Sequence, residues 1–77
     1  MKMVYDVSKK FKILKDTVSV YSEHINGVLC NVVELNNLFY YIGDEDITLF
    51  NVALAWQELT GKTLSTQDFQ KIKDDNC

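Results

Sequence analysis

The dipeptide Asn26-Gly27 constrains the fold of this sequence more than any other feature. It stands between TVSVYSEHI and VLCNVVEL, two runs rich in β-branched residues. A type I′ turn needs positive φ at both central residues, which asparagine and glycine tolerate, so this arrangement is a strong β-hairpin signal. Counting outward from the turn gives the expected cross-strand neighbours: Ile25 and Val28, His24 and Leu29, Tyr21 and Val32, Val20 and Val33, and Val18 and Leu35.

A second turn at Asn36-Asn37 extends this hairpin into a meander. It sets Leu35 opposite Leu38, Val33 opposite Tyr40 and Val32 opposite Tyr41. A weaker turn at Lys15-Asp16 makes residues 11–14 a further strand, with Ile13 beside Val18 and Phe11 beside Val20. We therefore expect three to four antiparallel strands joined in chain order.

Alternation along these strands separates the side chains into two faces. One face is apolar throughout, which an arbitrary register would rarely give, and we expect it to form the core. The other face is mixed but has an aromatic row of its own. The expected core face is Phe11, Ile13, Val18, Val20, Val33, Leu35, Leu38, Tyr40 and Ile42. The other face is Lys10, Lys12, Leu14, Ser19, Tyr21, Glu23, Cys30, Val32, Glu34, Phe39 and Tyr41.

Residues 47–59, ITLFNVALAWQEL, have the length and composition of a helix. Its expected polar stripe is Thr48, Asn51, Ala55 and Glu58, and its other sides are apolar, so we expect cover on more than one side. Gly61 suits the left-handed position after a helix. Ser65 and Asp68 have capping-box spacing, which predicts a short second helix from about residue 66.

These elements predict an α+β fold, in which a three- to four-stranded antiparallel β-meander is packed on one face by a C-terminal helical pair. The 77 residues form a single small domain, 1–77, whose segments 1–8 and 75–77 we expect to fray. An all-helical alternative for residues 28–42 would place both turn dipeptides inside helices, which disfavours it.

Charge is unevenly distributed along the chain. The net charge is −3; residues 1–16 carry five lysines, whereas residues 17–60 carry six acidic groups and no lysine. The chain has no arginine, which disfavours sequence-specific nucleic-acid reading. Two cysteines, Cys30 and Cys77, are too few for a disulfide framework. The N-terminal residues resemble no signal peptide and no apolar run could span a membrane, so we expect a cytoplasmic protein.

Three motifs invite a chemical interpretation, and each has a simpler one. The run Gly43 to Asp46 could supply carboxylates to Ca²⁺ or Mg²⁺, but acidic residues also favour a helix start, which we prefer. Gly61-Lys62-Thr63 resembles the end of a phosphate-binding loop, but Trp56 occupies the position of the first glycine. His24 is the only histidine, and its expected register places it on the opposite face from Cys30. We expect no enzyme activity, no cofactor and no metal.

The aromatic row on the second sheet face is the candidate site. Exposed aromatic residues in a small domain can serve sheet stability alone, or they can mark a contact surface, which we favour. We expect a protein-protein interaction module, an inhibitor or accessory protein of a phage or mobile element, that blocks a basic or nucleic-acid-binding host or rival protein. The expected partner-binding residues are Tyr21, Val32, Phe39, Tyr41, Asp44, Glu45 and Asp46.

Two alternatives use the same face. In the first, the aromatic side chains stack on single-stranded nucleic acid while lysines contact its phosphates. The acidic chain without arginine disfavours this alternative. In the second, the face joins copies of the chain into a homodimer or larger assembly. The lysines of the first alternative are Lys9, Lys10, Lys12 and Lys15.

Overall fold

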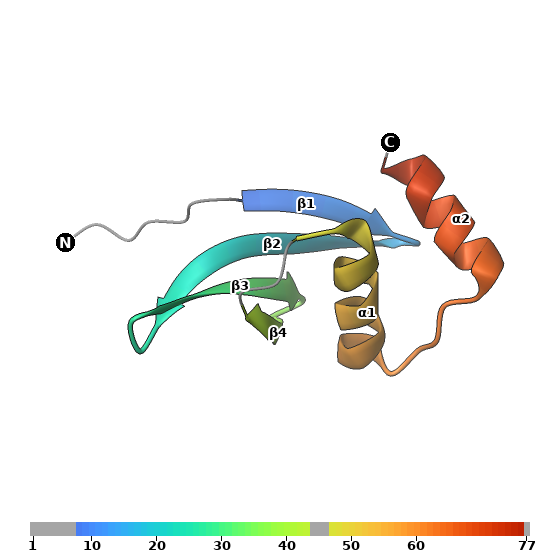
Figure 1. Cartoon of the computed structure of the whole chain (residues 1–77). Coiled ribbons are helices and arrows are strands. Elements are labelled where there is room, and N and C mark those ends of the chain that lie inside the picture. The colour runs from blue at the N-terminus through green and yellow to red at the C-terminus, as the bar shows by residue number, and fades with distance from the viewer. Residues whose placement is uncertain (1–7, 44–46, 77) are drawn as a thin grey trace.

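The structure is a computed structural model that describes residues 8–43 and 47–76. A four-stranded antiparallel sheet in the order β1-β2-β3-β4 is followed by two helices that pack on it (Figure 1). The predicted α+β fold is confirmed, with four strands. The elements are β1 (Ser8–Ile13), β2 (Asp16–Ile25), β3 (Val28–Leu35), β4 (Leu38–Gly43), α1 (Leu49–Thr60) and α2 (Thr66–Asp75).

Both asparagine-containing turns form as predicted. Their central residues all have positive φ, at 52° and 80° for Asn26 and Gly27 and at 50° and 67° for Asn36 and Asn37. This is the backbone pattern of a type I′ turn. The predicted register also holds from Ile25 opposite Val28 to Val20 opposite Val33, and from Leu35 opposite Leu38 to Val32 opposite Tyr41. It then shifts by one residue at Ile42, so that Asn31 lies opposite Gly43.

The first turn differs from the prediction. It comprises Leu14 and Lys15, so Ile13 faces Asp16 and Phe11 faces Val18. Leu14 accepts a φ of 59°, which is unfavourable for a bulky residue. In this register Ile13 is fully buried, and the adjacent Asp16 carboxylate accepts a hydrogen bond from Trp56 Nε1 at 2.8 Å. The register slips by two residues relative to the expected one, so every side chain of β1 keeps its face.

The core lies between one face of the sheet and α1. It joins Val18, Val20 and Val33 to Val52 and Trp56, and Ile72 of α2 belongs to the same cluster. Burial of such apolar side chains is the main force that holds the sheet to the helices. The remaining members are Ile13, Leu35, Ala53, Ala55 and Leu64.

Two residues that we assigned to the core are exposed. Leu38 and Tyr40 are on the helix side of β4, as alternation predicts, but they are 52% and 38% exposed. The reason is their position on an edge strand. β4 has β3 on one side, and no further described strand lies on the other to close over its side chains.

Helix α1 begins later than predicted. Its N-cap is Thr48, whose hydroxyl accepts a hydrogen bond from the backbone N–H of Asn51 at 3.1 Å. The preceding acidic residues Asp44 to Asp46 lie outside the described residues, and the first turn of the helix contains no acidic side chain. The predicted polar stripe is also wrong, because Ala55 is buried while Phe50 and Leu54 are exposed.

Helix α2 starts with the predicted capping box and ends against β1. The Ser65 hydroxyl accepts from the Asp68 N–H, and the Asp68 carboxylate accepts from the Ser65 N–H. At the other end, Asn76 Oδ1 accepts from the Lys12 N–H and Asn76 Nδ2 donates to the Lys12 carbonyl, each at 2.8 Å. The Asn76 side chain thus bonds to the backbone of β1 as a neighbouring strand would.

The molecule is elongated, with extents of 44 × 25 × 21 Å. The hairpin of β2 and β3 runs past the helices and ends at an exposed tip that includes Val28 and Leu29 (Figure 1). Within residues 8–43 and 47–76, neither helix has the length and apolar character needed to cross a membrane.

Candidate functional site: the outer face and free edge of the sheet

The face of the sheet opposite α1, here called the outer face, carries the predicted aromatic row. The observed register places Tyr21 of β2 opposite Val32 of β3, and Val32 opposite Tyr41 of β4. Phe39 lies on the same face two residues before Tyr41. The structure therefore brings Tyr21, Val32, Phe39 and Tyr41 together on three adjacent strands.

These four residues differ in how much surface they offer. Phe39 and Tyr41 are 47% and 53% exposed, Tyr21 is half-buried, and Val32 has no exposed surface. Val32 lies outside the main core cluster, so its burial belongs to the outer face. Its role here is to support the row, while Tyr41 and Phe39 present the contact area.

Charged residues on the outer face are separated by strand. Glu34 of β3 pairs with Phe39 on one side and with Ser19 on the other, and Ser19 pairs with Lys10 of β1. The aromatic side chains of β4 therefore have a carboxylate as their nearest charged cross-strand neighbour. The lysines of β1 lie two strands further away. The remaining predicted residues, Asp44, Glu45 and Asp46, lie outside the described residues.

Sequence alternation missed a second group of exposed apolar side chains beside this row. Leu38 and Tyr40 lie on the inner face of β4, and Phe50 and Leu54 of α1 are 60% and 39% exposed. Tyr40 and Leu54 line a small pocket of about 120 Å³ with Ile42 and Asn51. Four consecutive residues of β4, from Leu38 to Tyr41, are thus exposed and apolar or aromatic. The signal in the sequence was the uncharged run LFYYIG on a terminal strand.

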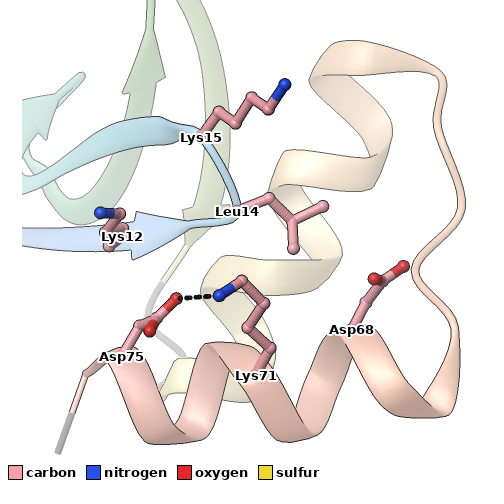
Figure 2. Close-up of a pocket in the computed structure, with 6 residues that line it drawn as sticks. All are labelled: Lys12, Leu14, Lys15, Asp68, Lys71 and Asp75. Carbon is pink, nitrogen blue, oxygen red and sulfur yellow. Dashed lines mark ion pairs between the residues drawn. The ribbon is translucent and has the colours of Figure 1, made fainter.

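A larger pocket lies between the first turn and α2, with a volume of about 680 Å³ (Figure 2). Lys12 and Lys15 contribute from the β1 side, and Leu14 points toward α2 between them. The α2 wall contributes Lys71 and Asp75, which form an ion pair at 3.8 Å. Asp68 lines the same pocket. Because lysine and aspartate side chains both line this open pocket, its charge favours neither an anionic nor a cationic ligand.

The described residues show no arrangement typical of a catalytic or metal site. His24 faces Leu29 and Cys30 faces Glu23, so His24 and Cys30 project from opposite faces, as the register predicted. No group of three or more His, Cys, Asp or Glu side chains in the described ranges could hold a metal ion. Nor does any buried side-chain nitrogen or oxygen there lack a hydrogen-bond partner.

Comparison of the chain with protein-family models, with curated proteins and with solved structures gives no match. Its function is therefore inferred from the chemistry of its own surface.

Proposed function

We propose that this protein is a non-enzymatic protein-protein interaction module that binds and blocks a larger partner through the outer face of its sheet. The single observation that carries this proposal is the exposure of Phe39 and Tyr41 beside Tyr21 on the sheet face opposite the main core cluster. Tyrosine and phenylalanine supply large contact area at little cost in side-chain entropy, and aromatic residues are enriched in interface centres.

The charges around this row favour a protein partner with a basic rim. Glu34 flanks Phe39 and Glu23 lies on the same face of β2. In the sequence, Asp44, Glu45 and Asp46 follow directly after β4. Opposite charges at the edge of an interface steer association and fix its orientation more than they add affinity. A basic or nucleic-acid-binding protein, of a host or of a rival, fits this distribution.

The biological setting belongs to the proposal as well. A chain of 77 residues without arginine or proline, but with many Lys, Asn and Ile, is typical of an A/T-rich coding sequence. Such composition and size suit a small inhibitor or accessory protein of a phage or mobile element. Such an inhibitor would act by steric or electrostatic occlusion of the partner's own binding site, without any reaction.

Affinity capture with the tagged protein tests this function. In a lysate of the source organism, we expect the wild-type chain to retain a specific protein. Tyr41→Glu should abolish capture, because it places a charge on the most exposed residue of the row. Tyr21→Ser should weaken it about tenfold or more, as loss of an interface aromatic residue typically does.

The matched control is Leu29→Ser. Leu29 is 41% exposed and lies on the helix side of β3, so its change removes a comparable apolar side chain from the opposite face. Leu29→Ser should leave capture unchanged. Equal capture by the wild type, Tyr21→Ser and Tyr41→Glu, with all variants folded by circular dichroism, would refute the outer face as the binding site.

One observation favours a second candidate function, single-stranded nucleic-acid binding. Lys10 and Lys12 lie on the outer face of β1, the same face as the aromatic row. Lys9 lies on the other face, and Lys15 lies in the first turn. Two of the four lysines predicted for phosphate contacts are therefore on the required side, although Glu34 stands between them and Phe39.

A further inference from the structure

We propose that the free edge of β4 pairs with β4 of a second copy of this chain, forming one continuous antiparallel sheet across a symmetric dimer. This inference concerns the backbone edge of β4 and the side chains on both of its faces, and it does not depend on the proposed function. It follows from the direction of the β4 backbone groups, the contrast between the two sheet edges and the self-complementary sequence of the strand.

The backbone direction follows from the Asn36-Asn37 turn. In a two-residue hairpin the flanking residues, here Leu35 and Leu38, exchange backbone hydrogen bonds, and bonded and non-bonded pairs then alternate along the strands. Leu38 and Tyr40 therefore direct their N–H and C=O groups toward β3. Phe39 and Tyr41 direct theirs away from β3, toward the free edge.

The same counting can be checked at the opposite edge. The first turn makes Ile13 and Asp16 a bonded pair, so the backbone groups of Lys12 should point outward from β1. They do, because Lys12 N–H and C=O both bond to the side chain of Asn76 at 2.8 Å. The outward direction of the Phe39 and Tyr41 backbone groups is deduced by the same count from a two-residue turn.

The two edges of the sheet are protected very differently. β1 carries Lys9, Lys10 and Lys12, and Asn76 covers part of its backbone. Lysines and covering groups are the usual means by which proteins prevent pairing at a sheet edge. β4, with the sequence LFYYIG, has no charged residue and no proline, and in the described part of the chain β3 is its only paired neighbour. From Leu38 to Tyr41 its edge is regular and open to another strand, and the register shift at Ile42 ends this stretch.

The sequence of β4 is complementary to itself in an antiparallel register centred on Tyr40. Outward-facing residues must meet outward-facing residues, so Phe39 lies opposite Tyr41 of the second copy and Tyr40 lies opposite Tyr40 on the two-fold axis. The regular part of β4 ends at Tyr41, because the register with β3 shifts at Ile42. Each Phe39-Tyr41 pair exchanges two backbone hydrogen bonds and stacks aromatic rings on the outer face. A register shifted by one pair, with Tyr41 on the axis, would leave Leu38 beyond the end of the second copy's β4, which ends at Gly43.

The available area predicts a weak dimer. Leu38, Phe39, Tyr40 and Tyr41 are 52%, 47%, 38% and 53% exposed. Side chains of this kind bury roughly 150–250 Å² each when fully covered, so the strand offers roughly 400 Å² per copy. Two copies would bury about 800 Å² in total, below the roughly 1,200 Å² of a stable specific interface, and Leu54 beside Tyr40 adds to it. The dimer should therefore dissociate on dilution.

Light scattering over a concentration series up to about 1 mM tests association. We expect the wild-type mass to rise from monomer to dimer, and Tyr40→Lys to remain monomeric because it places two ammonium groups opposite each other on the axis. Leu29→Lys is the matched control, since Leu29 is similarly exposed on the same face but lies outside β4. It should dimerise like the wild type. A wild-type chain that stays monomeric throughout this range would overturn the proposal. This holds even if a different protein is found to bind the edge of β4.

Cross-linking tests the register in a chain with Cys30 and Cys77 replaced by serine. Tyr40→Cys should form a disulfide-linked dimer under mild oxidation, because non-bonded antiparallel pairs have Cα atoms about 4.5 Å apart, within disulfide range. Leu38→Cys should remain monomeric, since the two Leu38 positions would be on the order of 13 Å apart along the strands. Efficient cross-linking of Leu38→Cys, or of Tyr41→Cys in place of Tyr40→Cys, would overturn the register. The Tyr40 and Leu38 variants leave Tyr21, Phe39 and Tyr41 unchanged, so loss of the dimer and loss of partner capture are separate results.

Discussion

At the scale of single residues, one hydrogen bond joins the first turn to the helix that covers the core. Trp56 is 2% exposed, and its indole N–H donates to the half-buried carboxylate of Asp16 at 2.8 Å. A buried indole needs such a partner, because an unsatisfied donor retains the full cost of its desolvation. The bond also explains why the chain accepts the positive φ of Leu14, since that turn brings Asp16 to Trp56.

We predict that Asp16→Ala lowers the free energy of unfolding by about 1–3 kcal/mol, the usual cost of an orphaned buried donor. Asp16→Asn should lose less, because its amide oxygen can still accept. Urea unfolding followed by the fluorescence of Trp56, the only tryptophan, measures both. Asp74→Ala is the control, since Asp74 is exposed and its carboxylate accepts from the exposed side chain of Gln70 at 3.2 Å. Equal stability of Asp16→Ala and Asp74→Ala would contradict the prediction.

At the scale of elements, the end of α2 is fastened to β1 by one side chain. Asn76 Nδ2 donates to the carbonyls of Lys12 and of Ile72, and Asn76 Oδ1 accepts from the Lys12 N–H. This side chain therefore caps the helix and covers the β1 edge at the same time. Ile72, one turn earlier in α2, is fully buried in the core.

Asn76→Ala should therefore loosen α2 and expose the edge of β1. We expect a loss of about 1–3 kcal/mol in unfolding free energy, because each hydrogen bond contributes about 0.5–1.5 kcal/mol and the three share one side chain. Hydrogen exchange should show faster exchange of the Lys12 amide. Gln70→Ala, which removes an exposed bond on the same helix, should leave that amide protected. An unchanged Lys12 amide in Asn76→Ala would show that α2 docks without this contact.

The elements that could be predicted from the sequence are those whose chemistry is local. Asn26-Gly27, Asn36-Asn37 and the Ser65-Asp68 capping box each need only neighbouring residues, and each forms as expected. The first turn could not be predicted, because a partner 40 positions away in the sequence, Trp56, decides where it falls. Long-range contacts routinely override local preference in this way.

The candidate site shows the same division. Alternation placed Tyr21, Phe39 and Tyr41 on one face, and the structure has them there. Alternation could not show that Val32 is buried while Tyr40 is exposed. It tells on which face a side chain lies, but not whether neighbouring groups shield that side chain from solvent. That shielding depends on which strand is at the edge of the sheet and on where α1 crosses it.

At the scale of the whole molecule, the sheet divides the surface into regions of different charge. Lysines gather on β1 at one edge, whereas β4 at the other edge is uncharged and aromatic. Glu34 and Glu23 lie between them on the outer face. A single-stranded nucleic acid that stacked on Phe39 and Tyr41 would have to pass these carboxylates to reach Lys10. This arrangement separates the stacking groups from the phosphate-binding groups that such binding combines.

We therefore predict that a fluorescent single-stranded oligonucleotide binds only at low salt, and that anisotropy shows binding disappearing at physiological ionic strength. Binding by a few exposed lysines alone falls steeply with salt, since it depends on counterion release. A Lys10→Gln, Lys12→Gln double variant should remove the low-salt binding, while Tyr21→Ser should leave it intact, because stacking takes no part. Binding that persists at physiological ionic strength and is lost in Tyr21→Ser would instead make the aromatic row a base-stacking surface. That result would favour nucleic acid over a protein as the partner of the outer face.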